Sequence, residues 1–262
     1  MTRALVAVVF IAVLGAACDR NAVPSPPPPL PVAAAHQVAP RGFSIPRQTT
    51  QLVTAIVDDW SSTHARVALW QRTAAGWQRV GEPWPAVIGS TGAAWGVGLQ
   101  PAQRDGPTKR EGDRKSPAGV FALRGSYGYA DAAPHGWRMP YARSTDLLCV
   151  DDPASDRYAR IVDIKQVASD WASAEQMRRP DALYTWVVDV AHNPDATPGL
   201  GSCIFLHVWS GPDSATVGCT AMEQATLAAL LGRLDPAAHP LYVLLPRAEY
   251  TAVAAAWGLP AQ

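Results

Sequence analysis

The pattern of apolar and polar positions predicts short strands along much of the chain. Leu52–Val57, Arg66–Trp70 and Leu241–Leu245 are short runs rich in β-branched and aromatic residues, a composition typical of strands. Thr73–Gly76 predicts a hairpin turn into a further strand, Trp77–Val80.

Three other segments show the spacing of helices. They are Asp170–Arg178, Glu223–Leu234 and Ala248–Trp257, and the second carries leucines at intervals of three and four residues. Because strands outnumber these helices, we expect a mainly β fold with a few helices (α+β). About 215 residues follow the N-terminal region, enough for one domain with a sizeable core.

The stretch from Cys203 to Ala221 carries the candidate chemistry. Cys203–Trp209 is apolar except for His207, which predicts a buried strand bearing a histidine. Thr220 and Glu223 have the spacing of a capping box, so we expect a helix to begin just after Cys219. The positive end of a helix dipole lowers the pKa of a nearby thiol, so we expect an activated Cys219.

These residues can be combined into a thiol nucleophile site. Cys219 would attack a carbonyl carbon, His207 would act as the base, and the N–H groups of Gly218 and Cys219 would bind the oxyanion. His192, Asn193 or a backbone carbonyl would orient the base. The alternative is structural, because cysteine and histidine are often buried in protein cores.

Two segments resemble the L,D-transpeptidase (YkuD-type) catalytic domain family. Gly201–His207 followed by Thr216–Cys219 is similar to its His…(Ser/Thr)-x-Gly-Cys signature. Gly112–Phe121 resembles its Gly-Asp-x-Lys-Thr-Pro-x-Gly-x-Phe segment, and the resemblance runs from about Val87 to about Pro246. Three further segments resemble a peripheral branch of the family: Val150–Ser155, Trp171–Met177 and Leu183–Val188.

The resemblance implies a β-sandwich-like L,D-transpeptidase catalytic domain over residues 48–262. It implies Cys219 as nucleophile, His207 as base, a thioester intermediate and no cofactor. Weaker expectations are that Thr216, Trp209 and Lys115 contact the substrate. Better-studied members carry Arg or Asn two residues after the nucleophile, where this chain has Ala221, so the resemblance does not specify the acceptor.

The N-terminus predicts export. Residues 1–18 read as a lipoprotein-type signal peptide, with an uncharged core too short to span a bilayer and small residues before Cys18. Cleavage there would leave Cys18 lipidated, and plain secretion is the alternative. Residues 19–47 are rich in proline and alanine and predict an extended tether, with a proline-rich ligand segment as the other interpretation.

Charge, cysteine and histidine content bear on nucleic-acid binding, disulfide formation and metal binding. The chain has 22 basic and 22 acidic residues and no long basic run, so we expect no nucleic-acid partner. Cys149 and Cys203 are either a disulfide of an oxidising compartment or two buried thiols. The dispersed histidines and the lack of a Cys-x-x-Cys motif predict no metal.

The resemblance and the N-terminal segment together imply an exported, lipid-anchored, monomeric enzyme of the cell envelope that transfers acyl groups between peptidoglycan stem peptides. With water as acceptor the same site would be an L,D-carboxypeptidase or amidase. The second alternative is a catalytically idle lipoprotein that binds peptidoglycan. Two departures from the better-studied members suggest it: the missing polar residue at Ala221 and the shorter loop between His207 and Thr216.

Overall fold

A computed structural model describes residues 42–103 and 105–262. This part of the chain contains thirteen β-strands, two α-helices and one 3₁₀-helix, which confirms a mainly β fold with a few helices. The expected signal peptide with Cys18, and the tether as far as residue 41, lie outside the described residues.

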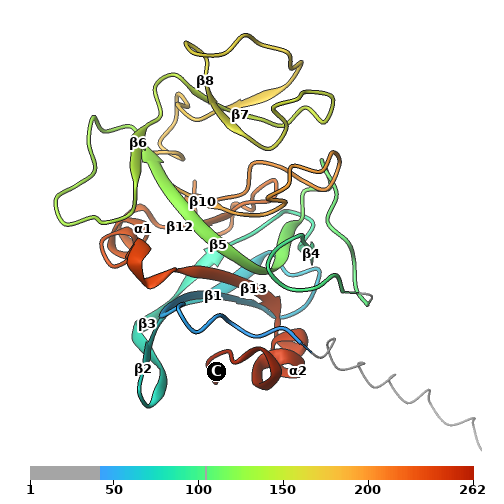
Figure 1. Ribbon diagram of the computed structural model, residues 1–262, viewed down its shortest axis with the longest axis vertical. Helices are drawn as coiled ribbons and strands as arrows, with labels where there is room; N and C mark the ends of the chain where they lie inside the picture. The colour runs from blue at the N-terminus through green and yellow to red at the C-terminus, as the bar shows by residue number, and fades with distance from the viewer. Residues whose placement is uncertain (1–41, 104) are drawn as a thin grey trace, which may run out of the picture. The chain divides into compact units, whose positions relative to one another are not determined.

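Eight of the strands close into a barrel (Figure 1), because β10, at one end of the sheet order, also pairs with β5. Most neighbours are antiparallel, while β1 with β13 and β11 with β12 are parallel. The sandwich-like arrangement expected from the resemblance is not confirmed, because these strands form one closed sheet. In order around the barrel the strands are β5 (Ser116–Gly128), β10 (Trp186–Val190), β11 (Phe205–Val208), β12 (Thr220–Met222), β3 (Gly76–Val87), β2 (His64–Thr73), β1 (Gln51–Val57) and β13 (Leu241–Pro246).

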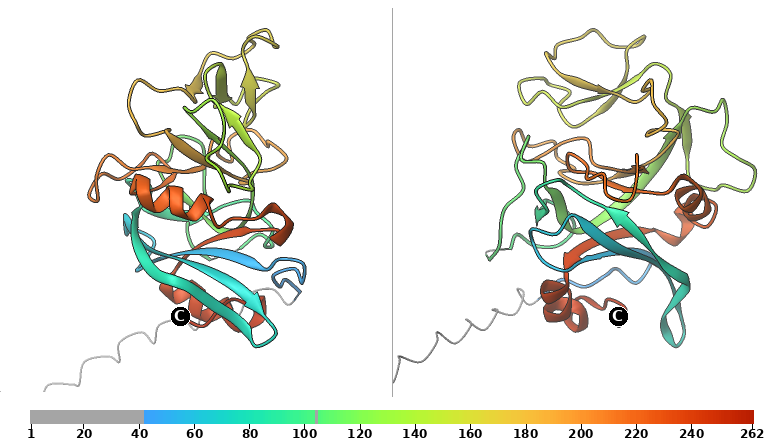
Figure 2. Two further views of the ribbon diagram at one scale, coloured as in Figure 1. Left: turned by 90° about the vertical axis from the view of Figure 1, so that its left-hand side faces the viewer. Right: turned by 180° about the vertical axis from the view of Figure 1, so that it is seen from behind.

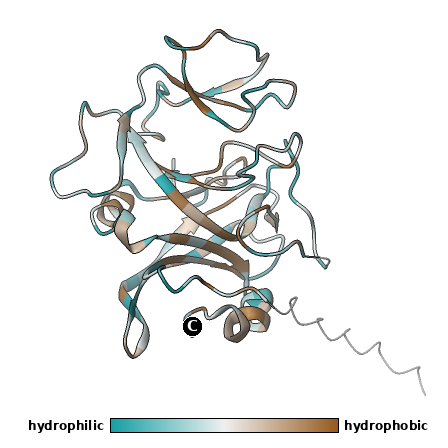
Figure 3. Ribbon diagram, viewed as in Figure 1, coloured by the Kyte–Doolittle hydropathy of each residue, from teal (hydrophilic) through white to brown (hydrophobic). Residues whose placement is uncertain are grey.

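The most apolar strands lie where the barrel is covered on both faces. Every residue of β1 and of β13 is buried, and Figure 3 shows brown over much of both strands. Helix α2 (Arg247–Trp257) follows β13 directly and packs against β1 and β13, burying Tyr250, Val253 and Trp257 (Figure 2). Each large apolar side chain buried in this way contributes roughly 1.5–3 kcal/mol.

The start of helix α1 (Gln224–Leu231) differs from the sequence prediction. Residues 220–222 form β12, and the side chain of Glu223, the residue before the helix, makes no capping hydrogen bond. The Thr220 hydroxyl lies 2.7 Å from that of Tyr242 on β13, so it is used across the barrel rather than as a cap. Leu227, Leu230 and Leu231 are buried as their spacing predicts.

A small three-stranded antiparallel sheet is inserted between β6 (Tyr141–Arg143) and β10. It consists of β7 (Leu147–Val150), β8 (Ile161–Asp163) and β9 (Ala174–Gln176), and we call residues 144–185 the insert. The predicted helix over 170–178 is wrong, because residues 174–176 pair with β7 instead. A disulfide joins Cys149 of β7 to Cys203, just before β11.

The remaining short elements flank the barrel. Strand β4 (Ala93–Trp95) runs parallel to β5, and the 3₁₀-helix Pro236–Ala238 leads into β13. The hairpin turn predicted at Thr73–Gly76 joins β2 to β3. Over the described residues, no helix has the length and apolar character needed to cross a bilayer.

Candidate active site

The structure brings Cys219 and His207 to one cavity. His207 on β11 is in register with Ala221 on the parallel strand β12, and Cys219 lies two residues before Ala221. Cys219 itself lies just before β12 and beside β11, with its sulfur 3.3 Å from the Phe205 nitrogen, so the thiol and the imidazole lie close to the same strand. Both line a cavity of about 240 Å³, which we call the histidine cavity. None of the hydrogen bonds of the described residues joins the two side chains.

Cys219 is the one free cysteine within the described part of the chain and is 4% exposed. Its sulfur accepts a hydrogen bond from the Phe205 N–H at 3.3 Å. Burial raises the pKa of the thiol to about 12, and the charge of Glu175 acts in the same direction. The expected lowering of this pKa by a helix N-terminus is wrong, because Cys219 precedes strand β12 and α1 begins only at Gln224.

His207 is held as a neutral base. Its Nδ1 lies 2.8 Å from the Val208 carbonyl oxygen, and since a carbonyl only accepts, Nδ1 carries the proton and Nε2 has a free lone pair. Burial lowers the pKa of His207 to about 4, so the ring is uncharged at neutral pH. Of the three expected orienting groups the structure uses a backbone carbonyl. His192 and Asn193 bond instead to carbonyls of residues 197–201.

The loop before Cys219 is fixed by two hydroxyls. Thr216 Oγ1 accepts from the Gly218 N–H at 3.1 Å and donates to the Cys219 carbonyl at 2.6 Å. Ser116 Oγ lies 2.7 Å from the Gly218 carbonyl and 3.0 Å from that of Cys219. Because the Gly218 N–H is already bonded, the structure removes it from the expected pair of oxyanion donors. The Cys219 N–H is the remaining member of that pair.

Two of the three residues that were weakly expected to contact the substrate line the cavity at Cys219, and the third does not. Trp209 and Thr216 line the histidine cavity. The ammonium group of Lys115 bonds to the Thr91 carbonyl, and Lys115 lines neither of the cavities at Cys219. The neighbouring residue Ser116 contacts the site instead, through its hydrogen bonds to the carbonyls of Gly218 and Cys219.

Three residues of the insert were not expected in the site. Tyr184 is 3% exposed, donates its hydroxyl proton to Glu175 at 2.6 Å, and packs edge-on against His207 with ring centroids 5.1 Å apart. Arg179 lies 3.8 Å from Glu175 and bonds to Asp181 at 2.9 Å. The polar residues of Trp171–Met177 and Leu183–Val188 were the available signal, but spacing along the chain does not show that they meet Cys219.

A second cavity of about 250 Å³ also reaches Cys219. Its wall includes Glu111, Asp151 and Glu175, with Lys109 and Arg114 as the cations. Glu175 and Cys219 line both cavities, so the thiol is approached from two directions. Such an arrangement can accommodate one group bonded to sulfur and another that attacks it.

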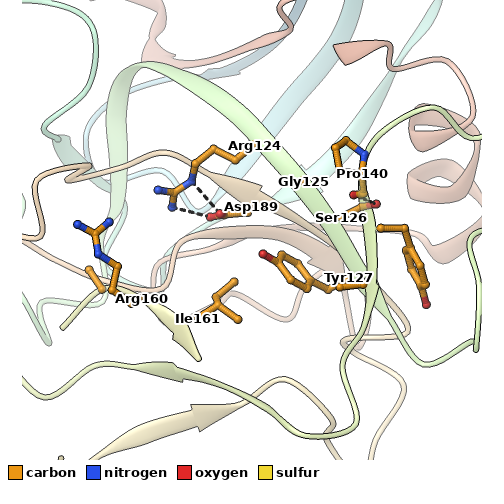
Figure 4. Close-up of a pocket in the computed structure, with 11 residues that line it drawn as sticks. Arg124, Gly125, Ser126, Tyr127, Pro140, Arg160, Ile161 and Asp189 are labelled. Carbon is orange, nitrogen blue, oxygen red and sulfur yellow. Dashed lines mark hydrogen bonds and ion pairs between the residues drawn. The ribbon is translucent and has the colours of Figure 1, made fainter. Parts of the chain in front are cut away.

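A third cavity, of about 370 Å³, lies between β5 and the start of β8 (Figure 4). Arg124 and Asp189 form a two-pronged ion pair in it, with nitrogen–oxygen distances of 2.8 and 3.0 Å. None of the site residues expected from the sequence lines this cavity. As for metals, no group of three His, Cys, Asp or Glu side chains in residues 42–103 and 105–262 is arranged to hold one.

Comparison with models of protein families, with curated proteins and with solved structures gave no match to this chain.

Proposed function

We propose that this protein is a cysteine acyl transferase of the L,D-transpeptidase type that acts on peptidoglycan stem peptides. The observation that carries the proposal is the free thiol of Cys219 in a cavity shared with His207, whose imidazole is neutral and has an unprotonated Nε2. The sequence resemblance at Gly201–Cys219 and Gly112–Phe121 supplies the substrate class.

The proposed reaction has two halves. Cys219 Sγ attacks the peptide carbonyl between an L-centre and a terminal D-residue, the carbon–nitrogen bond breaks, and the D-residue leaves as an amine. An acceptor amine then attacks the thioester, the carbon–sulfur bond breaks, and the sulfur is released. His207 Nε2 takes the proton of the Cys219 thiol and gives it to the leaving amine, then takes a proton from the acceptor amine and returns it to the sulfur, while the Cys219 N–H donates to the oxyanion. No cofactor is needed in either half.

Export and anchoring belong to the same proposal. Residues 1–18 would direct the chain out of the cytoplasm, Cys18 would carry lipid, and residues 19–47 would hold the domain away from the membrane. The mainly β domain would then be a divergent form of the L,D-transpeptidase fold, acting as a monomer in the periplasm or cell-wall space.

The burial of Cys219 favours a second candidate. A buried thiol with a pKa of about 12 is almost entirely protonated at neutral pH, as expected for a domain that binds peptidoglycan without reacting. The polar cavity walls at Glu175, Arg179 and Tyr184 favour the enzyme, because binding alone does not require charged and hydroxyl groups beside a thiol.

Mass spectrometry of the intact protein tests the proposal. Wild type and Cys219→Ala are incubated with disaccharide-tetrapeptide and, separately, with a carbapenem. We expect an adduct on the wild type alone, and a cross-linked product whose mass distinguishes an amine acceptor from water. Binding to peptidoglycan without adduct or product would favour the idle protein instead.

A further inference from the structure

A β-bulge in the barrel sets an ion pair into the wall of the third cavity. The register of β5 and β10 shifts there, so that Arg124 and Gly125 of β5 lie opposite the single residue Asp189 of β10. Bulges re-aim side chains and are common next to functional sites. Arg124 and Asp189, from neighbouring strands, form the two-pronged ion pair of Figure 4 and line the cavity together with Gly125.

The insert supplies a second arginine to the same cavity. Arg160 lies just before β8, and the preceding residue, Ala159, has a φ of 56°. This left-handed conformation costs a residue with a side chain roughly 1–2 kcal/mol. Hydrogen bonds with β7 hold the backbone in it: the Ala159 N–H donates to the Val150 carbonyl at 2.8 Å, and the Val150 N–H donates to the Arg160 carbonyl at 2.9 Å. The fold therefore keeps Arg160 at the cavity in spite of local strain.

Only one carboxylate in the cavity wall faces these two guanidinium groups. Arg124 uses Nε and Nη2 to bind Asp189, and its Nη1 has no partner in the described part of the chain. Arg160 forms no ion pair with residues 42–103 or 105–262, and its side chain donates only to the Pro194 carbonyl, at 3.2 Å. Asp189 is 7% exposed. The lining residues include two arginines and one aspartate as the charged groups, so the ionised wall carries a net charge of +1.

The Tyr127 hydroxyl is a further donor at this place. It makes no hydrogen bond to the described residues, and burial raises its pKa while the charges of Asp189 and Arg124 act on it in opposite directions. Figure 4 shows the hydroxyl pointing towards the ion pair, with the Arg160 guanidinium group on the same side as that of Arg124. Other lining residues are apolar: Pro140, Ala142 and Ile161.

We propose that this cavity binds a carboxylate attached to a small apolar body, as in a free carboxylic acid or the C-terminal residue of a peptide. The carboxylate accepts hydrogen bonds from Arg160, from Nη1 of Arg124 and from the Tyr127 hydroxyl, because planar guanidinium groups match its geometry. A single negative charge balances the charge of the wall, whereas a phosphate dianion is repelled more strongly by Asp189. The volume of about 370 Å³ lies within the range of known small-molecule sites, about 300–1,000 Å³.

This binding site is separate from the proposed function. Its lining residues are all different from those of the two cavities at Cys219. A protein without acyl-transfer activity would still bind the carboxylate, and an active enzyme could fail to bind it. The two proposals therefore stand or fall on different measurements.

Titration of the isotope-labelled full-length protein, followed by NMR, tests the inference. N-acetyl-leucine represents the end of a peptide, and hexanoate represents a free carboxylic acid. We expect a dissociation constant on the order of 1 mM for the better of the two, which identifies the source of the carboxylate. Amide signals of Gly125, Ser126 and Ile161 should shift. The neutral N-acetyl-leucinamide and inorganic phosphate should bind at least about tenfold more weakly.

Two variants test the site in different ways. Arg160→Gln removes an exposed charge, and loss of a charge-assisted hydrogen bond should weaken binding by about tenfold or more. Gly125→Val keeps every charge and fills space. A Cβ at Gly125 meets only the Pro140 carbonyl oxygen, at an ordinary 3.5 Å, so the valine fits the strand and should abolish binding. The matched control is Arg66→Gln, an exposed arginine of β2 that does not line this cavity and should leave binding unchanged.

Three results would overturn the inference. The first is that neither carboxylate binds at about 20 mM, in which case the ion pair serves only to join β5 to β10. The second is that N-acetyl-leucinamide or phosphate binds as tightly as the carboxylates, since the site would then not select a single negative charge. The third is an affinity unchanged in both Arg160→Gln and Gly125→Val, which would place the bound carboxylate elsewhere on the protein.

Discussion

At the scale of single residues, buried histidines make the fold sensitive to acid. His192 is 4% exposed, packs edge-on against Phe121, and lies 2.9 Å from the Leu200 carbonyl oxygen through Nε2. Burial lowers its pKa from 6.5 to about 4. Between these values the unfolded chain binds a proton that the folded protein does not bind, so stability must fall as the pH falls.

We predict that this effect costs about 3 kcal/mol of unfolding free energy for His192 between pH 7 and pH 4. The contribution is complete above about pH 6.5 and is lost progressively towards pH 4. Urea unfolding at several pH values measures it, with His192→Gln compared with the wild type. Glu175 and Asp189, whose raised pKa values act in the opposite direction, are common to both proteins. An equally steep pH dependence in His192→Gln and in a control variant of the exposed His64 would contradict the prediction.

Residue types alone identified the two central members of the candidate site, but not their surroundings. Cys219 and His207 stand out because a thiol and an imidazole flank a short loop after an apolar run. Glu175 and Tyr184 are far from that loop in sequence and reach it only because the insert folds over it. The prediction of a lowered pKa for the Cys219 thiol was wrong for the same reason, since that pKa depends on burial and on a carboxylate from another element.

At the scale of elements, the apolar runs predicted the strands they form, whereas the patterns at 170–178 and at Thr220 predicted the wrong local structure. Helix α2 and strand β13 follow the expected spacing because their buried faces run over six or more residues. The pattern over 170–178 is equally compatible with a short edge strand, and pairing with β7 decides the outcome. Likewise, Thr220 bonds to Tyr242 across the barrel and is not available to cap α1.

The disulfide cross-links the insert, at Cys149, to the segment that leads into barrel strand β11, at Cys203. It closes a loop of 54 residues, and in the chain-entropy description such a bridge stabilises the fold by about 4 kcal/mol. We predict that Cys149→Ser/Cys203→Ser lowers the unfolding free energy by up to that amount. Amide hydrogen exchange should become faster in β7, β8 and β9 while β1 and β13 remain protected. A uniform change across all strands would show that the bridge does not act on the insert in particular.

The same double variant tests how much the insert contributes to the candidate site. The barrel provides Cys219 and His207, whereas the insert provides Glu175, Arg179 and Tyr184. Loosening the insert should reduce the burial of the thiol and its repulsion by Glu175, so Cys219 should react faster with iodoacetamide while β11 and β12 stay folded.

At the scale of the described domain, closure of the barrel makes its first and last strands mutually dependent. Strand β13 lies between β1 and β5, in parallel register with β1 from Leu52 to Val57 and antiparallel to β5. The sequence predicted β1 and β13 as separate buried strands. It did not predict that they pair, since register between strands so far apart depends on the whole barrel.

We predict that deleting residues 241–262, which removes β13 and α2, abolishes folding of the barrel. The deletion exposes the fully buried β1 and leaves unpaired edges on both β1 and β5, so the loss should reach β11 and β12 and the Cys219 site. Circular dichroism and hydrogen exchange measure the loss. A variant lacking only the exposed terminal pair, residues 261–262, is the control. A deletion protein that keeps protected amides in β10 and β11 would show that this half of the barrel folds without closure, and that the site does not depend on the C-terminal strand.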